Sequence, residues 1–169
     1  MLNILPFKQS DSSRCGPASI KAVLYYYGID ITEDEICLRC EHTYELGCTN
    51  DNIKSAIESY GLGCSIIEMV DTSDLEYWTR HGVPVIVDWF TPGFNQGLED
   101  LPNGHASVVI GVDREKVYLM DPEIGQVRPI SHSDFMRCWF DWVDPLISKA
   151  PNNLTVRQGI ITFPGRLYA

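Results

Sequence analysis

The segment Cys15-Gly-Pro-Ala-Ser-Ile-Lys-Ala-Val-Leu-Tyr-Tyr-Tyr27 predicts the first regular element of this chain, a helix. Small and apolar residues recur at helical spacing along it. Pro17 stands near its start, where a missing backbone N–H costs least, and Gly28 follows as a stop. The segment therefore indicates a helix with one apolar face to bury, and Cys15 is its first residue.

Four further helices are expected from capping patterns and apolar faces. Thr32-Glu-Asp-Glu35 and Ser73-Asp-Leu-Glu76 both have the capping-box spacing that opens a helix. The expected helices run from Thr32 to about Cys40, from about Asn50 to Tyr60, from Ser73 to about Gly82, and from Ser131 to about Phe140. Most of the helical pattern thus lies in the first half of the chain.

The second half is rich in Val, Ile and aromatic residues, the composition typical of strands. Candidate strands are Cys64–Val70, Pro84–Phe90, Ala106–Val112, Lys116–Asp121 and Gln158–Phe163. Asp113-Arg-Glu-Lys116 fits a hairpin connection between the third and the fourth. Helices followed by antiparallel strands predict an α+β fold, because a parallel sheet would alternate strands with helices.

Composition limits the class of protein. The 169 residues are 44% hydrophobic, enough for one well-buried core, so we expect a single domain spanning residues 1–169. The 13 Lys and Arg against 23 Asp and Glu give a net charge of −10, which disfavours nucleic acid and anionic membranes as partners. The first residues lack the basic and apolar pattern of a signal peptide, and no apolar run is long enough to span a bilayer. We therefore expect a soluble, cytoplasmic protein.

The six cysteines are the unusual count in this composition. Three disulfides would suit a secreted and shorter chain, so reduced thiols are expected, one of which is a candidate for chemistry. The sequence contains no glycine-rich phosphate loop, and no cofactor is expected.

Cys15 is the candidate nucleophile. At the first turn of a helix, backbone N–H groups and the helix dipole favour an anion, and the thiolate is the reactive form of cysteine. The alternative is a small buried residue at a helix start, although Ser or Asp would cap a helix better.

His105 and Asp121 are the candidate base and its orienting group. His105 stands where a polar loop becomes an apolar strand, whereas the other three histidines (His42, His81 and His132) lie in polar surroundings and are expected to be exposed. Asp121 ends the strand that Pro122 stops. A hairpin of the two strands would place both residues at the same end of the sheet. Such a carboxylate fixes the imidazole tautomer and stabilises the imidazolium.

Gln9, six residues ahead of Cys15, is a candidate for the oxyanion hole. Acyl transfer needs donors directed at the developing oxyanion, and a side-chain amide together with the Cys15 backbone N–H would supply two. A solvated residue before a turn is the alternative for Gln9.

These residues, taken in order, resemble the papain-like cysteine peptidases. The pattern Gln9…Cys15-Gly-Pro-Ala, Gly104-His105, Asp121-Pro122-Glu-Ile-Gly125 and a late helix over Asp134–Trp139 is most similar to the double-glycine leader (bacteriocin-processing) peptidases and their free-standing relatives. The resemblance covers roughly residues 4 to 163. It implies a papain-like α+β fold, a peptide substrate, and Cys15 as nucleophile, His105 as general base and acid, Asp121 as orienting group and Gln9 in the oxyanion hole.

This sequence departs from many double-glycine peptidases, which form the N-terminal part of an ATP-driven exporter, because it contains neither a transporter nor an ATPase segment. We therefore expect an enzyme whose specificity depends on Pro84–Trp89 and on the loop Thr91–Gly104. That loop is long for a strand connection and abuts His105. It is expected to form a cleft wall or flap, or an ordinary surface loop.

Three other functions stay open from the sequence. Cys37, Cys40, His42 and Cys48 form a cluster of possible zinc ligands, although their spacing is unusual and Cys37 and Cys40 also fit a helix core. A catalytically silent, peptide-binding domain of the same fold is a second alternative. An amidase, deamidase or acyltransferase would use the same thiolate and the same acyl-enzyme, and is the third.

Overall fold

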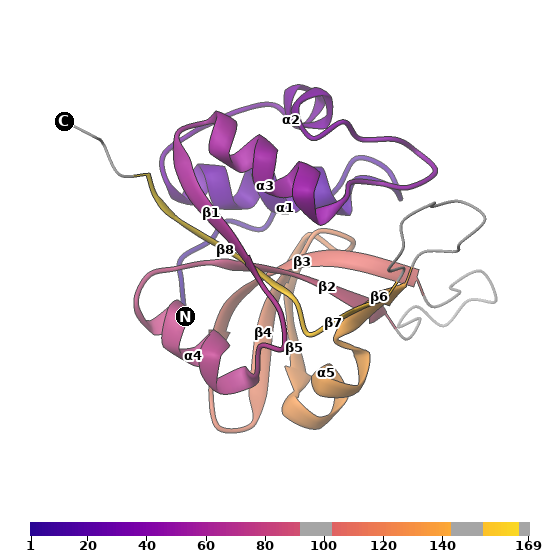
Figure 1. The fold of residues 1–169 in the computed structure, drawn as a ribbon. Helices are drawn as coiled ribbons and strands as arrows, with labels where there is room; N and C mark the ends of the chain where they lie inside the picture. The colour runs from indigo at the N-terminus through magenta and orange to yellow at the C-terminus, as the bar shows by residue number, and fades with distance from the viewer. Residues whose placement is uncertain (92–102, 143–153, 166–169) are drawn as a thin grey trace.

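The structure is a computed structural model that describes residues 1–91, 103–142 and 154–165 (Figure 1). Its helices are α1 (Cys15–Tyr26), α2 (Glu33–Arg39), α3 (Asn50–Ser59), α4 (Thr72–Arg80) and α5 (His132–Cys138). Its strands are β1 (Leu62–Ile67), β2 (Val85–Thr91), β3 (Asn103–Val112), β4 (Lys116–Asp121), β5 (Gln126–Ser131), β6 (Phe140–Trp142), β7 (Leu154–Val156) and β8 (Gly159–Pro164). In the described ranges, every helix falls short of the length and apolar character that crossing a membrane requires.

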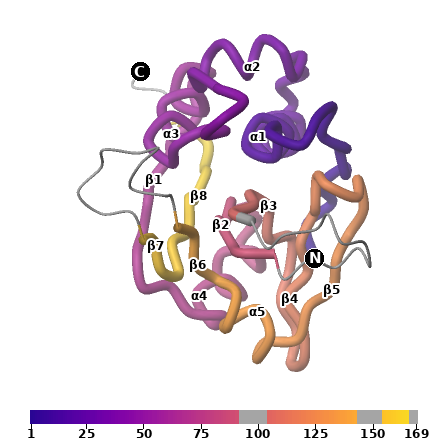
Figure 2. The backbone as a smooth tube through the Cα atoms, turned by 90° about the vertical axis from the view of Figure 1, so that its right-hand side faces the viewer, coloured from indigo at the N-terminus to yellow at the C-terminus, as the bar shows by residue number. Residues whose placement is uncertain are grey.

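A six-stranded sheet forms the centre of the fold. Its strand order is β1-β8-β2-β3-β4-β5, and all of its pairings are antiparallel. The strands β6 and β7 form a separate two-stranded ribbon. Figures 1 and 2 show α1, α2 and α3 on one side of the sheet and α4 and α5 on the other. The predicted α+β class, with helices packed on an antiparallel sheet, is confirmed.

Two apolar clusters hold the layers together. One lies between α1–α3 and the sheet and includes the fully buried Ile20, Leu24 and Met120. The other lies under α4 and α5 and is built around Trp89 and Trp139. Because strands alternate their side chains between the two faces, the sheet can supply both clusters at once. The central strand β3 is therefore buried on both faces, which makes it a rigid support for residues at its ends.

The helices lie close to their predicted ranges, with one correction. The expected capping box at Ser73–Glu76 is wrong, because α4 begins two residues earlier with Asp71 as its N-cap. The Asp71 carboxylate accepts hydrogen bonds from the backbone N–H groups of Ser73 and Asp74, and the Asp74 carboxylate accepts one from the Asp71 N–H. An aspartate at N3 thus replaces the Glu of the usual pattern.

The strands differ from the prediction mainly at the sheet edges. The strand β4 has the predicted bounds, but β1 lies at 62–67 instead of 64–70, because Met69 adopts a φ of 56° that extended backbone does not allow. The strand β5 escaped prediction because Pro129 weakens its pattern. As an edge strand, β5 tolerates proline. The ribbon strands β6 and β7 are too short, at three residues each, to leave a periodic signal.

Candidate active site

Cys15 is the first residue of α1 and lines a cavity of about 520 Å³. The three residues that follow it are buried, so the helix start is fixed in the core while the thiol stays half-buried at the cavity. The hydroxyl of Ser19, one turn further on, donates to the carbonyl of Ala106 at 3.2 Å and ties α1 to β3. The helix start expected for Cys15 is therefore present, and it faces β3.

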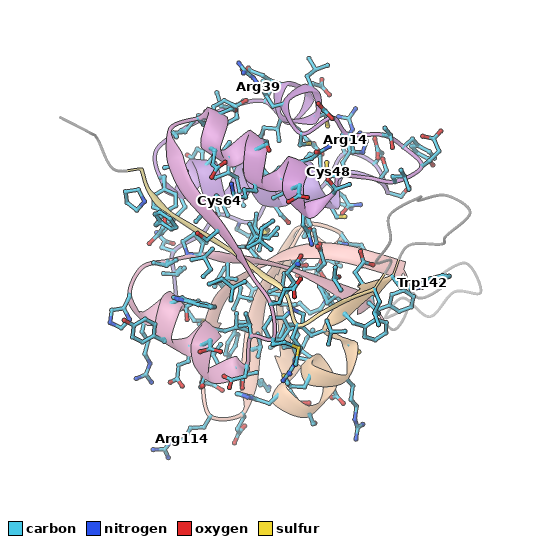
Figure 3. All side chains as sticks on the ribbon, in the orientation of Figure 1. Arg14, Arg39, Cys48, Cys64, Arg114 and Trp142 are labelled. Carbon is cyan, nitrogen blue, oxygen red and sulfur yellow. The ribbon has the colours of Figure 1, made fainter. Side chains whose placement is uncertain are left out.

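Part of the cavity wall is formed by residues 44–48, the segment that ends at Cys48. A Cβ on Gly16 would lie 3.3 Å from the Cβ of Cys48, so glycine lets this segment pack against the first turn of α1. Gly47 and Cys48 line the cavity next to Cys15. Figure 3 labels Cys48 and also Trp142, another lining residue at the end of β6.

His105 and Asp121 meet at the end of the β3–β4 hairpin. The His105 Nε2 lies 2.8 Å from the Asp121 Oδ1, and the two side chains are 8% and 0% exposed. Antiparallel pairing of β3 with β4 brings the start of one strand to the finish of the other. The predicted proximity of these two residues is thus present, produced by a local connection.

The other contacts of His105 are with Cys15 and Trp89. Burial lowers the pKa of His105, but hydrogen bonds to Asp121 and Cys15, with the negative charge of both, raise it more, to about 10. The Trp89 ring packs edge-on against the imidazole, with ring centroids 5.8 Å apart. The imidazole is therefore held in its charged form at neutral pH, and a tryptophan shields one side of it.

Asp121 has a second cationic partner, Arg128 on β5, whose Nε donates to Oδ2 at 2.5 Å. The backbone N–H of Glu123 also donates to Oδ1 at 2.9 Å. Burial would raise the pKa of Asp121, but the bond to His105 and the charges of His105 and Arg128 lower it below its usual value. Arg128 was not singled out from the sequence, because its strand was not predicted.

Donor atoms of His105, Asp121 and Glu123 lie within 4.8 Å of one another, close enough to hold a metal ion. Arg128, however, binds Asp121 and also lies 3.5 Å from the Glu123 carboxylate. A guanidinium between the two carboxylates already supplies the positive charge that a metal would bring. The group therefore fits an ion-paired cluster better than a metal centre.

Gln9 is not among the residues that line the cavity. Its backbone N–H donates to the Pro122 carbonyl at 2.9 Å, and its side-chain Nε2 donates to the Asp11 carbonyl at 2.8 Å. The Oε1 is buried and has no hydrogen-bond partner among the described residues. Gln9 is thus held beside the turn that follows Asp121. One of the two N–H groups of its side-chain amide donates to Asp11, which leaves the other available.

The four candidate zinc ligands do not gather at one point in the described structure. The Cys40 and Cys48 sulfurs are 2.8 Å apart, whereas the His42 Nε2 is bound to Ser13, 3.0 Å from its hydroxyl. Cys40 is fully buried, as expected of a core residue, and Cys37 is partly buried. This cluster therefore consists of one close thiol pair and two separate side chains.

Two cavity residues, Asp88 and Asp141, were missed from the sequence. Burial and the nearby Asp141 raise the pKa of Asp88 to about 7, and burial raises the pKa of Asp141. An acid inside the apolar run Val85-Ile-Val-Asp88-Trp-Phe90 is the signal that would have singled out Asp88. It lies in Pro84–Trp89, the segment expected to influence specificity.

The loop Thr91–Gly104, predicted to be a cleft wall or surface loop, falls mostly on residues 92–102, outside the described residues. Phe90 and Gly104, which flank it, line the cavity. The loop therefore leaves the sheet at the end of β2 and rejoins it at the start of β3, next to His105.

Comparisons with solved structures show the same fold. A putative C39-like peptidase from Bacillus anthracis aligns with a TM-score of 0.68 at 14% identity, covering 98% of this chain and 96% of that one. The peptidase domain of Streptococcus ComA, a bifunctional ABC transporter of a quorum-sensing pathway, aligns with a TM-score of 0.68 at 20% identity, covering 94% and 96%. A double-glycine-motif protease from an AMS/PCAT transporter, in complex with its leader peptide, aligns with a TM-score of 0.69 at 20% identity, covering 96% and 93%.

Sequence comparison identifies the family directly. Among curated proteins, none matches this sequence. The model of the Peptidase_C39 like family matches residues 1–142, most of the chain, and that range contains Cys15, His105 and Asp121. The resemblance to double-glycine peptidases seen in the sequence is confirmed, and the chain belongs to the Peptidase_C39 like family.

Proposed function

We propose that this protein is a cysteine peptidase that cleaves a peptide bond through a thioester on Cys15. The observation that carries the proposal is the position of His105, which interacts with Cys15 on one side and with the buried Asp121 on the other. A cysteine, a base and an orienting carboxylate in this order are the elements that nucleophilic catalysis needs. Membership in a peptidase family supports the same conclusion.

The proposed reaction begins with the Cys15 thiolate, which the adjacent imidazolium stabilises. The sulfur attacks the carbonyl carbon of the substrate, and the C–N bond breaks as His105 gives its proton to the leaving amine. Because Nε2 is bound to Asp121, Nδ1 is the nitrogen that exchanges this proton. The neutral His105 then takes a proton from water, whose oxygen attacks the thioester. The acid product leaves, and the thiolate and imidazolium are restored.

Asp121 and Gln9 have supporting roles in this proposal. Asp121 fixes the ring so that Nδ1 faces the sulfur, and Arg128 fixes Asp121 in turn. The Cys15 backbone N–H and the second N–H of the Gln9 amide would donate to the oxyanion. The first N–H of Gln9 is held by Asp11, which sets the orientation of the amide.

A peptide substrate is favoured by the family and by the solved relative that holds a leader peptide. An amidase, deamidase or acyltransferase would share the thioester, and a silent peptide-binding domain would share the fold. These alternatives differ in the product formed. Peptidases create new chain ends, deamidases change side-chain mass, and acyltransferases join the acyl group to an added amine.

The test is to incubate the protein with a complex mixture of synthetic peptides and identify products by mass spectrometry. Wild-type protein should create new chain ends, and Cys15→Ala and His105→Ala should lower the rate by several orders of magnitude. Glu68→Gln, at an exposed position just after β1, is the control. Cleavage that survives Cys15→Ala would refute the mechanism, and deamidated or amine-linked products without new ends would replace the peptidase by one of its alternatives.

A further inference from the structure

One wall of the active-site cavity is acidic. The lining residues include the carboxylates of Glu45, Asp88 and Asp141, and none of the described lining residues is a lysine or an arginine. Asp88 comes from β2 and Asp141 from β6, so the acidic wall depends on the sheet and the ribbon meeting beside His105. Its position is thus set by the folded core.

Asp88 and Asp141 lie close enough to interact with each other through charge. Asp88 also interacts with Asn50, whose side chain donates in turn to the buried Gln158. Among the described residues, neither aspartate forms an ion pair with an arginine or lysine, and the nearby charge of His105 only partly offsets the rise in the pKa of Asp88. Two neighbouring carboxylates out of bulk water repel each other unless a cation lies between them.

The fold makes specific room for Asp141. Its Oδ1 accepts the backbone N–H of Trp142 at 2.8 Å, which turns the carboxylate back toward β3. There it lies over Gly104, where a Cβ would overlap Oδ1 and come within 2.9 Å of Cγ. Any other residue at position 104 would displace the Asp141 carboxylate. The glycine before His105 therefore allows this carboxylate to form part of the acidic wall.

Exposed apolar side chains contribute to the rim of the cavity. Tyr44, Leu46 and Trp142 line it and are 70%, 45% and 49% exposed. Long basic side chains combine an apolar stem with a charged end, and such a rim matches the stem while the carboxylates match the end. Arginine has the further advantage that a planar guanidinium can bind two carboxylates at once.

We propose that Asp88 and Asp141 form a subsite for a cationic side chain, arginine or lysine, of the substrate that Cys15 cleaves. The subsite rests on the proposed function, because its ligand is part of the substrate. It adds a substrate class, peptides with a basic residue near the scissile bond. It differs from Asp121, whose carboxylate is already paired with His105 and Arg128 inside the protein.

The test uses small probes and requires no known substrate. N-acetyl-arginine amide and N-acetyl-citrulline amide have nearly the same shape, but only the first is charged. Each is added at millimolar concentrations while iodoacetamide alkylates Cys15, and the rate is followed by mass spectrometry. The arginine probe should protect Cys15 with an apparent affinity at least about tenfold higher than that of the citrulline probe. Equal protection, or none by either probe, would overturn the subsite.

Variants locate the effect. Asp88→Asn and Asp141→Asn preserve shape and should each weaken protection by arginine about tenfold, leaving the citrulline probe unaffected. Glu115→Gln removes the same charge beside Arg114, which Figure 3 shows at the bottom of the view, away from Trp142, and should change nothing. If the variant that carries both Asp88→Asn and Asp141→Asn still prefers the arginine probe, the assignment of the subsite to these two residues is refuted. If Asp88→Asn slows alkylation equally with both probes and leaves the preference for arginine unchanged, Asp88 acts on His105 and not on the substrate.

Failure of the subsite and failure of the proposed function are separable. The function fails if alkylation of Cys15 does not depend on His105, and the subsite fails if protection does not depend on charge. Peptide digestion gives a second readout, because lysine or arginine should be enriched within a few positions of the cleaved bonds. Cleavage sites without that enrichment would contradict the subsite while leaving the peptidase intact.

Discussion

Asp121 holds His105 from behind, with its Oδ1 2.8 Å from the imidazole Nε2 and its side chain fully buried. This single contact determines which nitrogen of the ring is left for Cys15. It also explains why the acid stands at the last residue of β4, because the hairpin with β3 brings that position to the histidine. The carboxylate is shared with Arg128, so the orientation of His105 depends on an edge strand.

Arg128→Gln should therefore weaken both stability and catalysis. The substitution removes a charge-assisted hydrogen bond to a buried carboxylate, which contributes about 2 kcal/mol to the free energy of unfolding. Urea denaturation measures that loss, and the rate of Cys15 alkylation measures its effect on His105. Arg137→Gln, on the exposed side of α5, is the matched control. Equal stability of the two variants would show that Arg128 does not hold Asp121.

Alkaline pH should destabilise the protein through His105. The pKa of this residue is about 10 in the folded state and about 6.5 when unperturbed. Between these values the folded state binds a proton that the unfolded chain has lost, so the stabilisation is complete below pH ~6.5 and disappears as the pH rises through ~10. Urea denaturation of wild type and His105→Gln across this range should show their difference in stability shrinking. A difference that stays constant or grows would contradict the ion pair.

Gly104→Ala should move Asp141 and thereby weaken arginine binding. The new Cβ would overlap the Asp141 carboxylate, which must shift from its place beside β3. We expect protection of Cys15 by N-acetyl-arginine amide to fall about tenfold, as in Asp141→Asn. Gly63→Ala, where the Cβ meets only the side chain of Phe163 on β8, is the control. Unchanged protection in Gly104→Ala would separate Asp141 from the subsite.

Cys40 and Cys48 should be the first thiols to form an intramolecular disulfide. Their sulfurs are 2.8 Å apart, and the segment carrying Cys48 lines the cavity. With oxidised glutathione as the oxidant, the two thiols become one disulfide and each glutathione disulfide yields two glutathione thiols. Non-reducing peptide mapping should recover the Cys40–Cys48 link in wild type and lose it in Cys48→Ser. Recovery of Cys40 as a free thiol after oxidation would contradict this pairing.

The pairing of His105 with Asp121 was predictable because it is local. A strand, a short turn and a second strand lie next to one another in the sequence, and antiparallel pairing then leaves little freedom. The helix start at Cys15 was predictable for a similar reason, since proline and glycine mark its two ends. The sequence could not show the distance between Cys15 on α1 and His105 on β3, because that distance depends on how α1 packs against β3.

The cavity wall was not predictable, since it requires the order of strands in the sheet. Asp88 and Asp141 are far apart in sequence and meet only because β2 pairs with β3 and because β6 packs nearby. Arg128 was missed because its strand, β5, was not predicted. Pro129 weakens the strand pattern there, and an edge strand tolerates proline. Gln9 was expected in the oxyanion hole, and one N–H of its amide donates to the carbonyl of Asp11, a turn contact that sequence spacing does not reveal.

The most direct test of the central claim, that His105 activates Cys15, is competitive labelling of all six thiols. Wild-type protein is treated with substoichiometric iodoacetamide near neutral pH, and each cysteine is quantified by peptide mass spectrometry. Cys15 should react well before the other five thiols, and His105→Ala should slow Cys15 alone, whereas substitution of the exposed His81 by alanine should leave the pattern unchanged. Equal labelling of Cys15 and the other partly buried thiols, or a Cys15 rate that does not depend on His105, would contradict this claim.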